Sequence, residues 1–150
     1  MPYSRSEPVR EVATNARFAS TPARFEPRKA EVGYTYVDVD SLEGEGPGGM
    51  VRKTRRATGA RAFGFNYFTL PPGVEGREHD HADQNMEEVY FVVKGSGTMR
   101  IDGEEVNLVS GRFIRVDPGS TRVPIAGDEG LELVTFGAPL DARYEPPDWG

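Results

Sequence analysis

The sequence contains no cysteine and only two histidines among its 150 residues. Without cysteine the chain forms no disulfide bond and offers no thiolate to a metal, so thiol chemistry is excluded. The formal net charge is −6, and a chain with this balance lacks the positive surface with which proteins bind nucleic acid. We therefore expect no nucleic-acid partner.

Long apolar segments are also missing. No run approaches the 18 residues typical of a membrane-spanning helix, and the N-terminus lacks the apolar core of a secretory signal. We therefore expect no membrane partner and a soluble, cytoplasmic protein.

Glycine and proline are abundant, with 18 and 12 residues respectively, which favours many short elements joined by turns over long helices. A chain of this length fits one domain. We expect residues 1–30 to form a polar N-terminal arm that is mobile or packs on a neighbouring chain. We expect residues 31–150 to form one β-barrel domain whose core spans residues 60–137.

Short strand-like runs alternate with turn signals along the chain. The expected strands are Tyr34–Asp40, Arg61–Leu70 and the runs EEVYFVVK, TMRI, EEVNLV, RFIRV and LELVTF. From EEVYFVVK onward, GSG, DG, SG, DPGS and GDEG separate the runs, and Asp102-Gly103 is the strongest hairpin signal among them. This spacing predicts an all-β, antiparallel sandwich or barrel.

Both histidines lie in the segment GVEGREHDHADQNMEEVYFVVKG. It contains Gly73, five further residues, His79 and His81, and later Glu88, six further residues and Gly95. This pattern resembles the first motif of the cupin superfamily, G-x5-H-x-H-x3–4-E-x6-G. The chain departs from the motif only between His81 and Glu88, where six residues stand instead of three or four and lengthen a loop.

The second cupin motif, G-x5-P-x-G-x2-H-x3-N, is similar to GRFIRVDPGSTRVPIA but incompletely matched. Gly111 and Gly119 agree with it. The proline is replaced by Asp117, the histidine by Arg122 and the asparagine by Ala126. Metal-binding cupins usually take a ligand from that histidine. One subunit of this protein cannot supply a three-histidine site.

The resemblance covers about residues 60–137. It implies the cupin-type double-stranded β-helix, an antiparallel jelly-roll barrel. The chain is also similar to small single-domain bacterial cupins of unassigned activity. It implies little about the reaction, because cupins include oxygenases, isomerases, sugar-binding modules and storage proteins. Catalytic residues are therefore left unassigned.

The first motif indicates a candidate metal site. His79 and His81 are two residues apart, so in an extended segment their side chains share one face, and Glu88 adds a carboxylate. Two imidazoles and a carboxylate suit one divalent transition metal, Fe, Mn, Ni or Zn. Three residues of the longer loop are further candidates for an oxygen ligand: Asp80, Asp83 and Gln84.

Arg122 changes the charge of this site. A guanidinium stays positive at any working pH and cannot coordinate a metal. It can pair with Glu88 when no metal is bound, or it can bind the carboxylate or phosphate of a small ligand beside Tyr90. In a third interpretation it lies at a strand end and points to solvent. The arginine and the missing histidine weigh slightly against a bound metal.

Three hypotheses about function follow. The first is a cupin that binds a small, anionic molecule in its barrel through Arg122, Tyr90 and Glu88, with a degenerate metal motif. The alternative is a metal-dependent enzyme of the oxygenase or isomerase type that uses His79, His81 and Glu88. The third is a structural or regulatory dimer with a vestigial pocket.

The strand EEVYFVVK also predicts an interface. Glu88 and Tyr90 share one of its faces, and the other face is apolar. If the Glu88 face lines the barrel, the apolar face needs cover from a second sheet, the N-terminal arm or a second subunit. From this face and the N-terminal segment we expect a homodimer.

Overall fold

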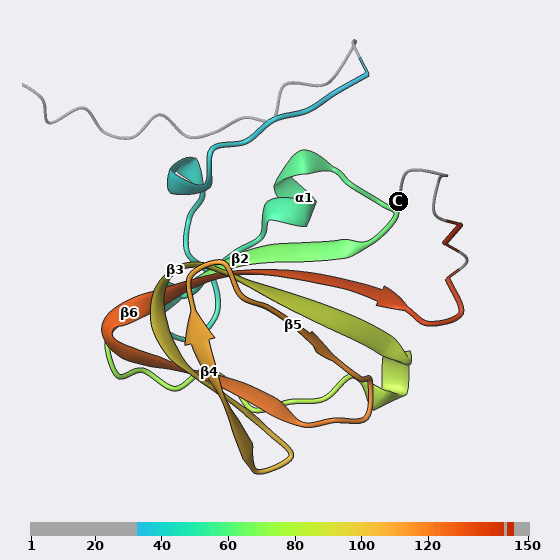
Figure 1. Ribbon diagram of the computed structural model, residues 1–150. Coiled ribbons are helices and arrows are strands. Elements are labelled where there is room, and N and C mark those ends of the chain that lie inside the picture. Colours follow the sequence, from blue (N-terminus) through green and yellow to red (C-terminus); the bar gives the residue numbers. More distant parts are fainter. Residues whose placement is uncertain (1–32, 143, 146–150) are drawn as a thin grey trace, which may run out of the picture.

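The computed structural model describes residues 33–142, 144 and 145. A six-stranded antiparallel sheet curves into a barrel (Figure 1), with strand order β1-β2-β6-β3-β4 and β5 paired with β3. The strands are β1 (Val51–Arg52), β2 (Gly64–Leu70), β3 (Met86–Ile101), β4 (Glu104–Val109), β5 (Phe113–Val116) and β6 (Arg122–Pro139). The predicted all-β, antiparallel jelly-roll barrel is confirmed.

Helical structure in the described part of the chain is sparse. It consists of α1 (Thr54–Thr58) and three 3₁₀ turns, η1 (Val39–Ser41), η2 (Pro47–Gly49) and η3 (Ala82–Gln84). Among the described residues no helix is long or apolar enough to cross a membrane.

Two long, bent strands, β3 and β6, connect the two layers of the barrel. The first part of β3 pairs with the end of β6 and with β5, whereas its second part pairs with the start of β6 and with β4. Each long strand therefore belongs to both layers of the barrel (Figure 1). This arrangement places Arg122, the first residue of β6, beside the loop that precedes β3. His79 of that loop forms an antiparallel bridge with Arg122.

The bends in β3 and β6 correct one detail of the sequence analysis. GSG and GDEG were expected to be turns between separate strands, but both lie inside continuous strands, β3 and β6. Two register shifts occur at this corner, between Val92 and Lys94 and between Gly95 and Gly97. Glycine is needed here because the strands approach closely: a Cβ on Gly97 would lie 2.1 Å from the carbonyl oxygen of Ile125.

Two further strand predictions had opposite outcomes. The Asp102-Gly103 hairpin is confirmed: both residues have positive φ, 49° and 88°, and they join β3 to β4. The strand expected at Tyr34–Asp40 is wrong, because residues 34–38 pair with no strand and a 3₁₀ turn begins at Val39. Alternation alone does not make a strand without a neighbouring strand to bond. The arm expected at residues 1–30 lies outside the described residues.

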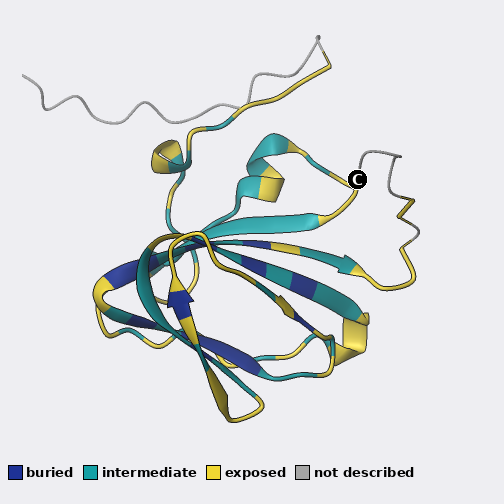
Figure 2. Ribbon diagram, in the orientation of Figure 1, coloured by how far each residue is buried: buried dark blue, intermediate teal, exposed yellow. Residues whose placement is uncertain are grey.

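Alternation along the paired strands separates a buried inner face from the outer face of the barrel (Figure 2). The inner positions of β3 and β6 form the centre of a core whose main members are Leu70, Tyr90, Val92, Met99, Leu108, Leu131 and Leu133. Glu88, Arg122 and Thr135 are the buried polar or charged residues of the described chain. Two of these three were predicted as site residues.

The glycine corner gives a prediction about stability. We expect Gly97→Ala to lower the free energy of unfolding by about 2–4 kcal/mol, because backbone atoms must move to admit the methyl group. Gly119→Ala is the matched control, since nothing lies within 4 Å of a Cβ there, and its effect should stay within about 0.5 kcal/mol. Urea unfolding measures both, and equal losses would show that the corner tolerates a side chain.

Candidate metal and ligand site

The candidate site is assembled from two loops and two strands. The bridge between His79 and Arg122 consists of two backbone hydrogen bonds, at 3.2 and 2.9 Å, which join the loop before β3 to the start of β6. The amide of His81 donates to the carbonyl of Pro118 at 2.9 Å. Glu88 lies on the inner face of β3. Backbone bonds thus place both histidines over this carboxylate.

One carboxylate oxygen, Glu88 Oε2, lies at the centre of the site. The Tyr90 hydroxyl donates to it at 2.5 Å and Arg122 Nη2 at 2.8 Å. His81 Nε2 lies 3.3 Å from the same oxygen and His79 Nε2 lies 3.8 Å from it. All five residues predicted for the metal or ligand site therefore meet at one atom.

Arg122 is wholly buried, with a relative exposure of 0%. Each of its three guanidinium nitrogens has an acceptor. Nε donates to the Tyr90 hydroxyl at 3.2 Å, Nη1 to the carbonyl of Ser120 at 3.0 Å, and Nη2 to Glu88. The predicted ion pair between Arg122 and Glu88 is confirmed, and the interpretation in which Arg122 points to solvent is wrong.

The two imidazoles present Nε2 toward Glu88. Nδ1 of His79 lies 2.9 Å from the carbonyl oxygen of Arg77. A carbonyl oxygen only accepts hydrogen bonds, so Nδ1 carries the proton and, in the neutral ring, Nε2 bears a lone pair. This lone pair faces a carboxylate oxygen, which is unfavourable unless a proton or another cation lies between them.

Burial alone would raise the pKa of Glu88, but the interaction with His79, the hydrogen bonds from Tyr90 and Arg122 and the charge of Arg122 outweigh it and lower the pKa to about 2. The carboxylate is therefore ionised at neutral pH. Burial and the adjacent negative charge of Glu88 raise the pKa of the Tyr90 hydroxyl far above its ordinary value. Tyr90 is thus a permanent hydrogen-bond donor to Glu88.

The pKa values of the two histidines are shifted in opposite directions. The interaction with Glu88 is the main cause that raises the pKa of His79. The hydrogen bond to the Arg77 carbonyl raises it further. Burial lowers the pKa of His81, and the charges of Arg122 and His79 lower it further although His81 lies closer to Glu88. At neutral pH the neutral ring of His81 has a lone pair available for a metal.

One ring nitrogen each of His79 and His81 and a carboxylate oxygen of Glu88 lie within 4.8 Å of one another and form a group that can hold a metal ion. Of the loop residues considered as further ligands, Asp80 accepts a hydrogen bond from the amide of Ala82 at 2.9 Å and is exposed. Asp83 and Gln84 are also exposed. None of the three belongs to this group.

Sequence analysis missed two partners of the site, the backbone carbonyls of Arg77 and Ser120. No sequence signal identifies them, because every residue carries the same carbonyl group and only the fold decides which one faces a side chain.

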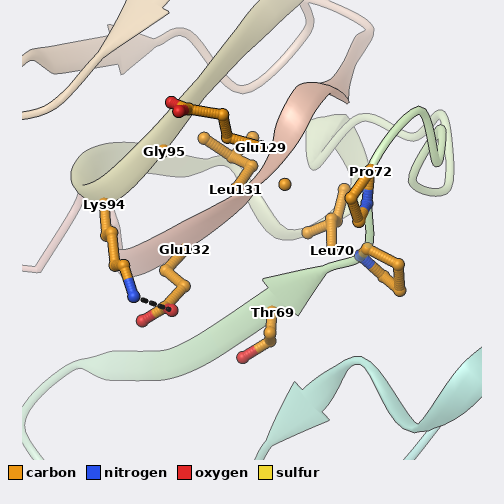
Figure 3. Close-up of a pocket in the computed structure, with 10 residues that line it drawn as sticks. Thr69, Leu70, Pro72, Lys94, Gly95, Glu129, Leu131 and Glu132 are labelled. Carbon is orange, nitrogen blue, oxygen red and sulfur yellow. Dashed lines mark ion pairs between the residues drawn. The ribbon is translucent and has the colours of Figure 1, made fainter.

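A separate hollow of about 170 Å³ lies at the glycine corner. Figure 3 shows Leu131 beside Glu129, Leu70 next to Pro72, and the ion pair of Lys94 with Glu132 on the border of the hollow. Glu132 also accepts a hydrogen bond from the Tyr67 hydroxyl. None of the five residues that meet at Glu88 lines it, so the hollow and the candidate site are distinct.

Comparison with known proteins agrees with this architecture. A family model described as "Cupin domain" matches residues 66–136. A cupin protein from Bacteroides fragilis superposes with a TM-score of 0.65 at 19% identity, over 77% of this chain and 92% of that one. A predicted oxalate decarboxylase from Thermotoga maritima superposes with a TM-score of 0.59 at 20% identity, over 70% of this chain and 99% of that one.

At these identities the two structures are similar to this chain in fold, and their activities do not transfer. A comparison with curated proteins found no match. The barrel, the motif residues and the family match together identify the class: residues 66–136 form a domain of the cupin superfamily.

The buried pair gives a pH-dependent prediction. Because the folded-state pKa of Glu88 lies below the ordinary value of 4.5, its charge stabilises the fold above about pH 4.5, and this contribution is lost as the pH falls toward 2. We expect Glu88→Gln to cost about 3–5 kcal/mol of unfolding free energy at pH 7, since Arg122 stays buried without its partner. Chemical denaturation at pH 3 should show less than half of this difference.

Glu87→Gln is the control for Glu88→Gln. Glu87 pairs with Arg115 at 2.7 Å, but the two side chains are 34% and 55% exposed. Solvent weakens such a pair, so this substitution should cost less than about 1 kcal/mol at either pH. Equal effects of the two substitutions would show that the Glu88 pair is not buried in solution.

Proposed function

We propose that this cupin binds one divalent transition metal through His79, His81 and Glu88, and a small anionic molecule next to it. One observation carries the proposal: the hydrogen bond between Nδ1 of His79 and the Arg77 carbonyl directs Nε2 to the point faced by His81 and Glu88. Histidines that bind metals commonly donate their second ring N–H to such an acceptor.

The spacing of the ligand atoms supports a metal. Atoms held about 2.0–2.2 Å from a common ion are roughly 2.8–3.6 Å apart in tetrahedral or octahedral geometry. Glu88 Oε2 lies 3.3 Å from Nε2 of His81 and 3.8 Å from Nε2 of His79. All three ligand atoms lie within 4.8 Å of one another, so the residues present fit such an ion if the imidazole rings move toward Glu88.

The charges explain why an anion should accompany the metal. In the metal-free protein the charges of Glu88 and Arg122 cancel, and every nitrogen of Arg122 already has an acceptor. A free carboxylate gains little by entering such a site. A divalent ion would leave the site with net positive charge and with open positions for an oxygen ligand. Anion binding should therefore depend on the metal.

Arg122 and Tyr90 have defined parts in this proposal. A bound metal would supply a Lewis-acid centre. Tyr90 keeps its proton and holds Oε2 of Glu88, and Arg122 provides a fixed guanidinium beside the same oxygen. We assign both residues the orientation of Glu88, and we assign Arg122 a positive charge that favours an anionic ligand at the metal. No proton acceptor for a specific reaction follows from the geometry, so the proposal concerns binding.

Calorimetric titration with Zn²⁺, Ni²⁺ and Mn²⁺ tests the metal site. We expect about one ion per chain in the parent protein, and at least a tenfold weaker affinity after His81→Ala or His79→Ala, since each removes one of three ligands. Asp80→Asn is the matched control, because Asp80 lies between the two histidines in sequence but outside the ligand group. A parent protein that binds none of the three ions would refute the metal site.

Succinate provides a probe for the anion in the same titration. The metal-loaded protein should bind it, and the metal-free protein should bind it at least tenfold more weakly. Equal affinity in both forms would separate the anion site from the metal and favour binding to Arg122 alone.

Arg122 itself offers a sharper prediction. Arg122→His should raise the affinity for Ni²⁺ or Zn²⁺ by at least tenfold, because it removes a positive charge and adds an imidazole. Arg122→Gln removes the charge without adding a strong ligand and should give a smaller gain. If neither folded variant binds more tightly than the parent, Arg122 does not oppose the metal. Circular dichroism confirms the folding of both.

A further inference from the structure

We propose that Asp102 is a positioning residue of the candidate site. Its carboxylate fixes the loop of residues 117–121, called here the DPGST loop, and backbone carbonyls of this loop orient Arg122 and His81. Asp102 lies at the turn between β3 and β4 and is itself exposed. The orientation of Arg122 needs no bound ligand, whereas the effect of Asp102 on metal affinity rests on the proposed function.

Asp102 extends the pairing of β3 with β6 by one residue. The ladder between the two strands ends at the pair of Ile101 with Arg122. Beyond this pair, the amide of Asp102 donates to the carbonyl of Thr121 at 3.0 Å. The amide of Thr121 donates in return to Oδ1 of Asp102 at 2.9 Å, where a continued ladder would offer a backbone carbonyl. The carboxylate thus completes the pair of bonds that the turn interrupts.

The carboxylate of Asp102 holds Thr121 through a further bond. The hydroxyl of Thr121 donates to the same Oδ1 at 3.1 Å. The interaction with the Ser120 side chain and the hydrogen bonds from Thr121 lower the pKa of Asp102. The acceptor is therefore ionised at neutral pH, and an ionised acceptor forms stronger hydrogen bonds than a neutral one. One residue thus holds Thr121 by its carbonyl, its amide and its hydroxyl.

One planar peptide group transmits this hold to Arg122. The carbonyl of Ser120 and the amide N–H of Thr121 belong to the same peptide unit, and they point in opposite directions because the unit is planar and trans. The N–H donates to Asp102, and the carbonyl accepts from Nη1 of Arg122 at 3.0 Å. When Asp102 fixes the direction of the N–H, it therefore also fixes the carbonyl that Arg122 contacts.

The DPGST loop also reaches one of the two histidines. The carbonyl of Pro118 accepts a hydrogen bond from the amide of His81 at 2.9 Å. Within the loop, the amide of Ser120 donates to the carbonyl of Asp117 at 3.2 Å, which closes the loop into a tight turn. A displacement of Thr121 would pass through this turn to Pro118. We therefore expect Asp102 to affect His81 as well, although less directly than Arg122.

Two substitutions of Asp102 separate its hydrogen-bond acceptor from its backbone conformation. Its φ is 49°, and both glycine and asparagine adopt a positive φ readily. Asp102→Gly removes the acceptor, whereas Asp102→Asn keeps an oxygen at the same place and is the matched control.

Nitrogen-15 NMR of the metal-free full chain measures how fast the Nε–H proton of Arg122 exchanges with water. Its signal is identified by its loss in Arg122→Gln. Because exchange requires local opening, Asp102→Gly should speed it by about tenfold, and Asp102→Asn should stay within about threefold of the parent.

Calorimetric titration with Zn²⁺ provides the second readout. Asp102→Gly should weaken Zn²⁺ binding by about three- to tenfold, less than the loss of a direct partner of a ligand, and Asp102→Asn should bind as the parent does. Unchanged affinity in Asp102→Gly would overturn the extension to His81. A parent that binds no Zn²⁺ would refute the metal of the proposed function, and the exchange rates would still decide whether Asp102 positions Arg122.

Equal exchange rates in the parent and Asp102→Gly would overturn the proposal. Equal increases in Asp102→Gly and Asp102→Asn would also overturn it, because the charge of Asp102 and not its acceptor geometry would then be responsible. If circular dichroism shows that Asp102→Gly does not fold, Thr121→Val takes its place, since it removes one bond to Oδ1 and keeps the hairpin. This variant should speed exchange by about threefold, and an unchanged rate would contradict the proposal.

Discussion

A single buried carboxylate oxygen, Glu88 Oε2, organises the polar interior of this barrel. A carboxylate removed from water needs compensating charge and hydrogen bonds, or it would be protonated. Arg122 supplies the charge and Tyr90 a hydrogen bond. Arg122 is itself wholly buried, and the Ser120 carbonyl and the Tyr90 hydroxyl satisfy its remaining nitrogens. Each buried polar group of the site thus requires the next.

This network explains how the barrel holds a polar site although an arginine stands at the position of the second-motif histidine. The guanidinium of Arg122 supplies the positive charge next to Glu88. The two histidines lie close to the same carboxylate oxygen. Nε2 of both rings still faces this oxygen, because the Arg77 carbonyl orients the ring of His79. Burial also lowers the pKa of His81, which favours its neutral form. The proposed metal site therefore rests on geometry that exists beside the ion pair.

The strands that carry the site use their two faces for different purposes. On β3, Glu88, Tyr90 and Val92 are buried inside, while Val89 and Phe91 alternate with them on the outside. The two-residue period of a strand makes this separation possible within a few residues.

The amino-acid sequence by itself determined the fold class, the Asp102-Gly103 hairpin and the five side chains of the site. Local spacing was sufficient, because the motif distances and the turn residues can be read from the sequence without knowledge of the fold. Only the tertiary structure decided that Tyr34–Asp40 is no strand and that β3 continues through its glycines, since strand pairing depends on distant residues. It also selected the carbonyls of Arg77 and Ser120 as partners of the site. Backbone carbonyls are alike in sequence, and long-range register alone determines which of them face His79 and Arg122.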